Sequence, residues 1–278
     1  MIPFHKMHGL GNDFVVFDAR RAPVVMDETA ARAVADRRLG IGCDQVIVVE
    51  RARNKGDALM RIFNADGREV EACGNAARCV ARLLMGEKDR TDVEIDSAGG
   101  LLFCRDAGAG SVTVDMGAPK FGWQDIPLAE AVDTNAMAIA IDGFDLDAAA
   151  VSIGNPHCVV FVDDADSASV SFLGPQIERH PLFPDRVNVE FVSRLPPGLL
   201  RMRVWERGVG VTRACGTGAC ASVAACARRG LGPRTSDVLL DGGTLSVEWR
   251  MIDDHILLTG PTNFVFAGEI DLAEWDGR

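Results

Sequence analysis

The chain repeats part of its own sequence once, and this duplication constrains its fold more than any other feature. Met60–Asn64 (MRIFN) returns as Met202–Glu206 (MRVWE), and Ala72–Gly74 returns as Ala214–Gly216 after the same interval along the chain. Self-similarity at a fixed spacing indicates that one structural unit is used more than once. The chain of 278 residues is therefore expected to contain two related halves.

Further matches keep the same order and nearly the same spacing. Gly11–Phe17 is echoed by Gly154–Phe161, so that Asn12 corresponds to Asn155. Between the blocks, Gln45 corresponds to Asn188 at the interval that also relates Asn12 to Asn155. Ordered blocks at one spacing predict that both halves share a single topology.

Each half has the same local pattern of short strands and one apolar helix. Runs rich in β-branched residues, separated by Gly, Asn and Asp, predict strands; they are residues 15–18, 46–50, 93–96, 112–116, 151–153, 159–163, 187–192, 202–205, 245–249 and 263–270. The helices are expected at 75–85 and 217–229, with Asn75 and Thr217 as N-caps. Their sides are apolar nearly all round, which suits helices enclosed by a sheet.

These features predict an α+β fold of two pseudo-symmetric domains, each a curved, mostly antiparallel half-barrel around a central helix. The active site is expected in the cleft between the domains. Residues 1–118 should form the N-terminal domain, completed by residues 264–278, and residues 119–263 the C-terminal domain. Residues 119–123 are a candidate hinge.

Composition excludes several classes of partner and cofactor. The net charge of −11 argues against nucleic-acid binding, which needs clustered Lys and Arg. Four lysines and no tyrosine leave little for a Lys or Tyr acid–base mechanism. The glycine-rich segments lack the third glycine of a dinucleotide fingerprint, and the chain has no P-loop, so we expect no cofactor.

The eight cysteines match neither a disulfide scaffold nor a metal site. They form no C-x-x-C pair and no zinc spacing with histidine, so no metal is expected. The amino terminus lacks the apolar core of a signal peptide, and no apolar run approaches the ~18 residues of a membrane span. We therefore expect a soluble, reduced, cytoplasmic protein without a membrane partner.

Two of the cysteines occupy equivalent positions in the repeat. Cys73 and Cys215 each precede the start of a predicted helix, next to a glycine. Backbone N–H groups and the helix dipole there favour a thiolate, which predicts a thiol pKa below the reference value of about 8.5. The other six cysteines are expected to be core residues, as small apolar side chains.

Two opposed thiols suit one reaction class: removal of a proton from one face of a carbon acid and return of a proton to the other. One cysteine must be thiolate while the other is thiol, and the roles exchange when the reaction reverses. Backbone N–H groups at Gly74-Asn75 and Gly216-Thr217 could hold an α-carboxylate. The pattern predicts an amino-acid racemase or epimerase without pyridoxal phosphate.

Repeated polar residues are candidates for substrate binding. The neutral ones are Asn12, Gln45, Asn64, Asn155 and Asn188. The counterpart of Asn64 is Glu206, and with Arg207 it could bind the ammonium and carboxylate of an amino acid. The amides could instead form turns, and Glu206-Arg207 could be a solvated ion pair.

The chain resembles the diaminopimelate epimerase family from about residue 4 to residue 260. Seven ordered motifs carry this resemblance: His8–Phe14 (HGLGNDF), Gly40–Gln45 (GIGCDQ), Arg61–Gly67 (RIFNADG), Cys73–Cys79 (CGNAARC), Gly154–Cys158 (GNPHC), Arg186–Asn188 (RVN) and Glu206–Cys220 (ERGVGVTRACGTGAC). The departures from the family pattern are mild and lie at Cys43, Ala76, Trp205 and Val211.

The resemblance implies interconversion of LL- and meso-2,6-diaminopimelate, in lysine and peptidoglycan synthesis, without a cofactor. It implies Cys73 and Cys215 as the proton donor and acceptor, with His157 and Glu206 tuning the thiols. The implied substrate ligands are Asn12, Gln45, Asn64, Gly74, Asn75, Asn155, Asn188, Glu206, Arg207, Gly216 and Thr217. The residues alone leave His157 equally open to a structural role in a turn.

A homodimer is a candidate assembly. Three other hypotheses about the function remain open. The same fold could act on proline or hydroxyproline, but Glu206-Arg207 with Asn64 and Asn188 could hold a second amino-acid head group that proline lacks. A thiol redox protein would use the same cysteines without a need for the head-group residues. A non-catalytic binding protein would not need paired thiols.

Overall fold

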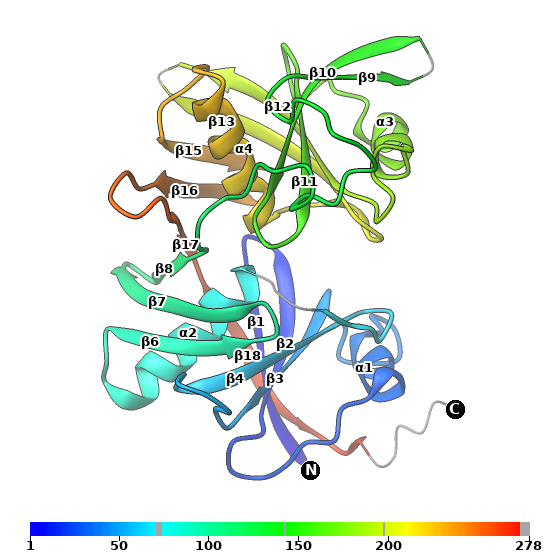
Figure 1. The fold of residues 1–278 in the computed structure, drawn as a ribbon. Helices are drawn as coiled ribbons and strands as arrows, with labels where there is room; N and C mark the ends of the chain where they lie inside the picture. Colours follow the sequence, from blue (N-terminus) through cyan, green and yellow to red (C-terminus); the bar gives the residue numbers. More distant parts are fainter. Residues whose placement is uncertain (71–73, 142, 197, 273–278) are drawn as a thin grey trace. The chain divides into compact units, whose positions relative to one another are not determined.

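The chain folds into two compact units. A computed structural model of the chain describes residues 1–70, 74–141, 143–196 and 198–272. Unit 1 comprises residues 1–114 and 260–278, and unit 2 comprises residues 115–259 (Figure 1). In the described part, no helix is both long enough and apolar enough to cross a bilayer.

Unit 1 is a mixed sheet with two helices. Its elements are β1 (Ile2–Gly9), β2 (Asn12–Asp18), α1 (Glu28–Ala35), β3 (Gln45–Glu50), β4 (Ala58–Asn64), β5 (Glu69–Val70), α2 (Gly74–Lys88), β6 (Asp92–Ser97), β7 (Gly100–Gly108), β8 (Ser111–Asp115) and, from the end of the chain, β18 (Asn263–Ile270). The last strand pairs antiparallel with the first, Ile2 opposite Ile270.

Unit 2 repeats this arrangement. Its elements are β9 (Met137–Ile141), β10 (Phe144–Ser152), β11 (Pro156–Phe161), α3 (Val170–Glu178), β12 (Asn188–Leu195), β13 (Leu199–Glu206), β14 (Gly210–Thr212), α4 (Gly216–Arg228), β15 (Thr235–Leu240), β16 (Gly243–Trp249) and β17 (Ile256–Pro261). Here β9 pairs with β10 as β18 pairs with β1 in unit 1. Lys120 of the predicted hinge bridges to Ser152 inside unit 2.

Strand registers show that the two units share one topology. The parallel pair β2–β3 places Phe14 opposite Gln45, and the parallel pair β11–β12 places His157 opposite Asn188. In the repeat, His157 corresponds to Phe14 and Asn188 corresponds to Gln45. The parallel contacts β4–β6 and β13–β15 correspond in the same way, and the remaining described strand pairs are antiparallel. The predicted α+β duplication is confirmed.

The central helix of each unit is enclosed by strands, as its composition predicts. All residues of α4 from Gly216 to Cys226 are buried, and the helix packs against β10, β11, β12, β13, β15 and β16. Helix α2 packs in the same manner against β1, β2, β6 and β7. A helix of Ala, Cys and Val permits this close approach because its side chains are small.

The predicted N-caps are wrong. Helix α4 begins at Gly216, and its N-cap is Cys215, whose extended backbone (φ −121°) precedes the first turn. Thr217 and Asn75 lie inside the first turns of α4 and α2. A cysteine can occupy the capping position because its sulfur accepts the backbone N–H hydrogen bond of Gly218, which the hydroxyl of a serine or threonine cap would otherwise accept.

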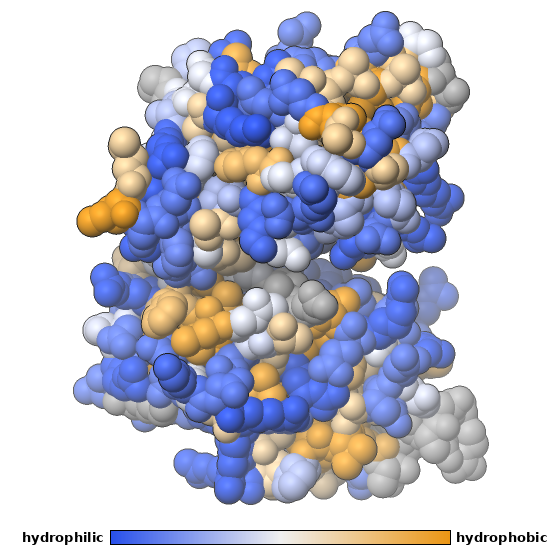
Figure 2. Space-filling model, viewed as in Figure 1, coloured by the Kyte–Doolittle hydropathy of each residue, from blue (hydrophilic) through white to orange (hydrophobic). Residues whose placement is uncertain are grey.

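One loop of unit 2 carries exposed apolar side chains. The loop between β16 and β17 projects from the surface with an orange tip in Figure 2. Met251 and Ile252, in this loop, are 86% and 90% exposed. One apolar core cluster of unit 2 lies between α3 and strands β9 to β12.

Candidate active site

The start of α4 holds the sulfur of Cys215 in a defined position. Its Sγ accepts a hydrogen bond from the backbone N–H of Gly218 at 3.4 Å and lies 3.6 Å from Thr217 Oγ1. Only 5% of the residue is exposed. The sulfur therefore lies where the first-turn N–H groups of α4 point.

The pKa of Cys215 moves in the direction opposite to the sequence expectation. Burial raises the pKa well above its ordinary value, and the charges of Glu206 and Glu190 raise it further. The hydrogen bonds from Thr217 and Gly218 lower it by less. The thiol form of Cys215 is therefore favoured over the thiolate, because loss of the proton would place a charge in a desolvated site beside carboxylates.

His157 lies beneath this helix start and is fully buried. Its Nδ1 is 2.7 Å from Glu190 Oε1, and its Nε2 is 2.9 Å from Asn155 Oδ1. Asn155 Nδ2 in turn donates to Thr217 Oγ1 at 3.4 Å. The fold thus brings four of the residues singled out in the sequence, Asn155, His157, Cys215 and Thr217, into one polar chain.

The Glu206-Arg207 segment is held by neighbours at the end of β13. The Glu206 carboxylate accepts a hydrogen bond from the hydroxyl of Thr212. Asn188 Oδ1 accepts the backbone N–H of Arg207 at 2.9 Å, and Asn188 Nδ2 donates to Pro156 O at 3.1 Å. Asn188 is therefore committed to two backbone groups and fixes the turn that carries Arg207.

A buried carboxylate at the end of α3 supports the same turn. Glu178 Oε1 accepts the N–H of Gly208 at 3.0 Å, and Glu178 Oε2 accepts Trp205 Nε1 at 2.7 Å. Only 2% of Glu178 is exposed. Sequence reasoning does not find this residue because its partners lie far from it along the chain and only the fold brings them together.

In unit 1 the predicted residues form two amide pairs. Asn75 Nδ2, in the first turn of α2, donates to Asn12 Oδ1 at 3.0 Å. Gln45 Nε2 donates to Asn64 Oδ1 at 2.9 Å across the β3–β4 pair. Gly74 is the first residue of α2. Cys73 lies outside the described residues.

An ionic network holds the ends of strands β2 and β3, where Asn12 and Gln45 lie. Arg37 bridges Asp13 and Asp44 at 2.7 Å each, and Lys6 binds Asp13 and the carbonyl of Gly42. Burial alone raises the pKa of Asp13, but hydrogen bonds and charges from Arg37 and Lys6 lower it to about 2. Asp44 Oδ2 accepts Asn12 Nδ2 at 3.0 Å, so this network orients Asn12.

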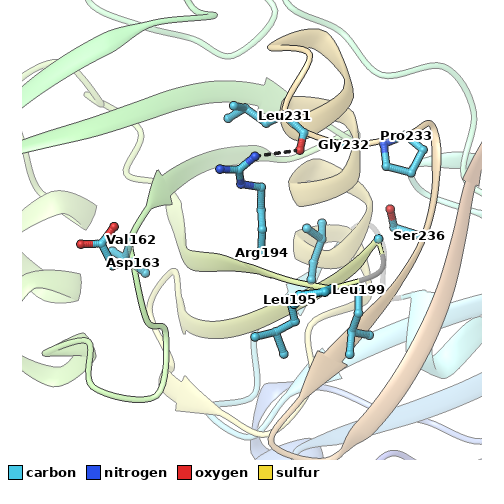
Figure 3. A pocket seen from close by; sticks show the side chains of 12 residues that line it. Val162, Asp163, Arg194, Leu195, Leu199, Leu231, Gly232, Pro233 and Ser236 are labelled. Carbon is cyan, nitrogen blue, oxygen red and sulfur yellow. Dashed lines mark hydrogen bonds between the residues drawn. The ribbon is translucent and has the colours of Figure 1, made fainter.

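A cavity elsewhere in unit 2 has no cysteine or histidine among its described lining residues. This cavity of about 440 Å³ between the β12–β13 turn and the end of α4 is lined mainly by aliphatic side chains, with Arg194 donating to Leu231 O (Figure 3). No group of three or more metal-ligating side chains occurs among the described residues. The described cysteines are all free and buried.

Comparison with known proteins identifies close relatives over nearly the whole chain. The family model "Diaminopimelate epimerase" matches residues 4–122 and 149–265. A diaminopimelate epimerase of Rhodospirillum centenum is 52% identical over 96% of this chain and 91% of its own. One of Erythrobacter litoralis is 51% identical over 99% of both chains.

Solved structures of lower identity share the fold. A hydroxyproline epimerase from Agrobacterium vitis, with bound trans-4-OH-L-proline, has a TM-score of 0.71 at 19% identity, covering 97% of this chain and 90% of that one. This likeness concerns the fold alone, whereas the family model and the sequence relatives cover most of the chain. The chain therefore belongs to the diaminopimelate epimerase family.

Proposed function

We propose that the chain interconverts LL- and meso-2,6-diaminopimelate in the cytoplasm, as a step of lysine and peptidoglycan synthesis. Relatives of that name, about half identical over nearly the full length, support the substrate. The observation that carries the chemistry is the position of the Cys215 sulfur at the start of α4, where it accepts the backbone N–H of Gly218 at 3.4 Å.

Two thiols balance the reaction without a further acid or base. The thiolate of Cys73 removes the α-proton from one face and becomes a thiol, while the thiol of Cys215 gives its proton to the opposite face and becomes a thiolate. The C–H bond electrons stay on the α-carbon between these transfers. The raised pKa of Cys215 suits it to be the donor in this direction, and the roles exchange in reverse.

The helix starts stabilise the charge that develops. The first intrahelical bond of α4 runs from Ala219 N to Cys215 O, so the N–H groups of Gly216 and Thr217 precede it. These two groups would bind the α-carboxylate of the substrate, as Gly74 and Asn75 would at α2. We assign to His157 and Glu206 the role of tuning the acidity of the two thiols.

The remaining predicted site residues would recognise the two amino-acid head groups. Glu206 would bind an ammonium and Arg207 a carboxylate. The amides assigned to substrate binding are Asn12, Gln45, Asn64, Asn75, Asn155 and Asn188. Four of them already form the pairs Asn12–Asn75 and Gln45–Asn64, which pre-orients their remaining lone pairs and hydrogens.

One alternative is an epimerase of proline or hydroxyproline, since an enzyme of that kind shares the fold. The test is to incubate the reduced protein with LL-diaminopimelate in deuterated water. We expect meso product carrying deuterium at one α-carbon. Exchange into proline, with none into diaminopimelate, would contradict the proposal.

We also infer a homodimer, formed through β18. This strand exposes three consecutive apolar side chains, Phe264, Val265 and Phe266, at 58%, 51% and 44%. Successive residues of a strand point to opposite faces, so both faces of β18 are apolar and open. Covering such a strand with a second copy would bury an apolar surface that otherwise faces water.

A further inference from the structure

The buried carboxylate of Glu190, which is paired with His157, has no role in the proposed reaction. Both side chains are fully buried, Glu190 on β12 and His157 on the neighbouring β11. Glu190 Oε2 has no hydrogen-bond partner among the described residues, and Oε1 contacts His157 Nδ1 at 2.7 Å. A buried carboxylate is costly unless another group compensates it, so this pairing needs a reason.

The hydrogen-bond partners determine how many protons the pair holds. Oε1 and Nδ1, 2.7 Å apart, must share a proton, because two lone pairs would repel at that distance. Nε2 faces the side-chain amide oxygen Oδ1 of Asn155. Because this oxygen can only accept a hydrogen bond, Nε2 carries a proton as well. The pair therefore holds two protons and has no net charge.

The direction of the remaining bonds follows from this. Asn155 accepts from His157 through Oδ1 and donates to Thr217 Oγ1 through Nδ2. Because Oγ1 accepts from Asn155, the hydroxyl hydrogen of Thr217 is available to Cys215 Sγ, 3.6 Å away. A donated hydrogen bond stabilises a thiolate more than a thiol.

We propose that Glu190 is a positioning residue for Cys215: it holds His157 with a proton on Nε2, and His157 fixes Asn155 and Thr217 so that the Thr217 hydroxyl donates to the sulfur. The proposal rests on the assigned role of Cys215 as a proton carrier. His157 acts through this chain, since both of its ring nitrogens are occupied by Glu190 and Asn155.

Packing explains why the carboxylate lies under the helix start. A Cβ on Gly218 would lie 2.7 Å from Glu190 Oε1, so the backbone of α4 rests directly on this side chain. Among the described residues, the charged groups that act on Sγ are Glu206 of β13 and Glu190 of β12, and His157 of β11 contacts Glu190. Both carboxylates oppose a thiolate there, and the proton that His157 shares with Glu190 offsets part of the second charge.

The first experiment compares Glu190→Gln with Glu190→Leu. The rate at which iodoacetamide alkylates Cys215 is measured against pH by peptide mass spectrometry, because the rate follows the thiolate fraction. Glutamine can donate to Nδ1 and keep the proton on Nε2, so we expect a rate within about twofold of wild type. Leucine releases the ring, and we expect alkylation about threefold slower or more below the thiol pKa.

Glu248→Leu, an exposed acid on β16, is the matched control and should alkylate as wild type does. Equal slowing in Glu190→Gln and Glu190→Leu would overturn the proposal, because it would mean that a hydrogen bond to Nδ1 of His157 is not enough to keep the Thr217 hydroxyl directed at the sulfur. Wild-type alkylation in Glu190→Leu would overturn it as well.

A second comparison separates His157 from the sulfur. His157→Gln breaks the chain between Glu190 and Asn155, and we expect slower alkylation of Cys215. Adding Glu190→Leu to His157→Gln should slow alkylation no further, because Glu190 acts through His157. A double variant that is slower than His157→Gln by the full factor seen in Glu190→Leu alone would show that Glu190 acts on the thiol without His157, and would overturn the proposal.

Nitrogen-15 NMR of the wild-type imidazole covers the case in which the variants fail to fold. We expect a proton on Nε2 and a strongly downfield proton shared between Nδ1 and Glu190. A ring with Nε2 unprotonated at neutral pH would overturn the proposal. None of these measurements uses diaminopimelate. They therefore test the role of Glu190 even if the protein does not act on that substrate.

Discussion

At the scale of single residues, the two ends of the polar chain differ in what the sequence reveals. Cys215 is identified by its repeat partner and its glycine neighbour. Glu190 lies within an apolar run that predicts a strand, and an acid at a buried strand position is the only signal it gives. Its role depends on the register that sets β12 beside β11 and under α4, which local sequence does not determine.

Substitution of Cys215 should stop epimerisation without loss of the fold. The thiol fills a capping position that alanine can occupy at a modest cost of about 1 kcal/mol. We expect Cys215→Ala to convert no LL-diaminopimelate, while Cys226→Ala, in the same helix, stays active. Measuring both by chiral chromatography checks this, and turnover by Cys215→Ala at the wild-type rate would contradict the assignment.

Asp13 should stabilise unit 1 in a pH-dependent way. Its pKa falls from 3.8 to about 2 on folding, so the ionised carboxyl favours the folded state above pH 4. This contribution, on the order of 2 kcal/mol, is lost as the pH falls through about 2. We expect Asp13→Asn to lower stability by this amount from pH 7 to 5, in urea unfolding, with the difference narrowing below pH 4. A constant difference down to pH 2.5 would argue against it.

At the scale of elements, the central helices are predictable and the peripheral ones are not. Helices α2 and α4 each begin at a glycine and are rich in small apolar residues. Helix α3 contains Gly174-Pro175, which indicates a turn in sequence, and α1 has only eight residues. Strand β1 gives no clear signal because His5, Lys6 and His8 interrupt its apolar pattern, although Lys6 is buried through its bonds to Asp13 and Gly42.

Gly174 allows α3 to pack on β13. A Cβ at this position would lie 2.6 Å from the Trp205 ring, so Gly174→Ala should destabilise the protein by about 1–3 kcal/mol. Gly86, in α2, has open space around it, and Gly86→Ala should stabilise by about 0.5–1 kcal/mol. Thermal unfolding of the two variants tests these predictions. A shift of both melting temperatures in the same direction, relative to wild type, would contradict them.

At the scale of the whole molecule, the duplication is visible in the sequence. Of the two strands that complete the sheets, the sequence predicts only the one at residues 263–270, and β9 is not predicted. The repeat predicts equal topology, and the registers of β2–β3 and β11–β12 agree with it. The same edge of each sheet is filled differently, by β9 from within the second half and by β18 from the end of the chain. The repeated blocks carry no signal for these strands, because neither lies inside them.

The exposed strand β18 provides a test of assembly. Val265→Lys places a charge on an apolar strand surface and should shift a dimer to monomer in sedimentation velocity. Val25→Lys, at an exposed valine elsewhere in unit 1, should leave the assembly unchanged. A dimer that persists in Val265→Lys, or a wild-type monomer, would argue against β18 as the interface.

The central claim is that each of two thiols serves one face of the α-carbon. Deuterium exchange by Cys73→Ala and Cys215→Ala tests it most directly, with LL- and meso-diaminopimelate supplied separately in deuterated water. We predict that Cys215→Ala exchanges the α-proton of the LL configuration without inverting it, and that Cys73→Ala exchanges only the opposite configuration. Inversion by either variant, or exchange of the same configuration by both, would contradict the account.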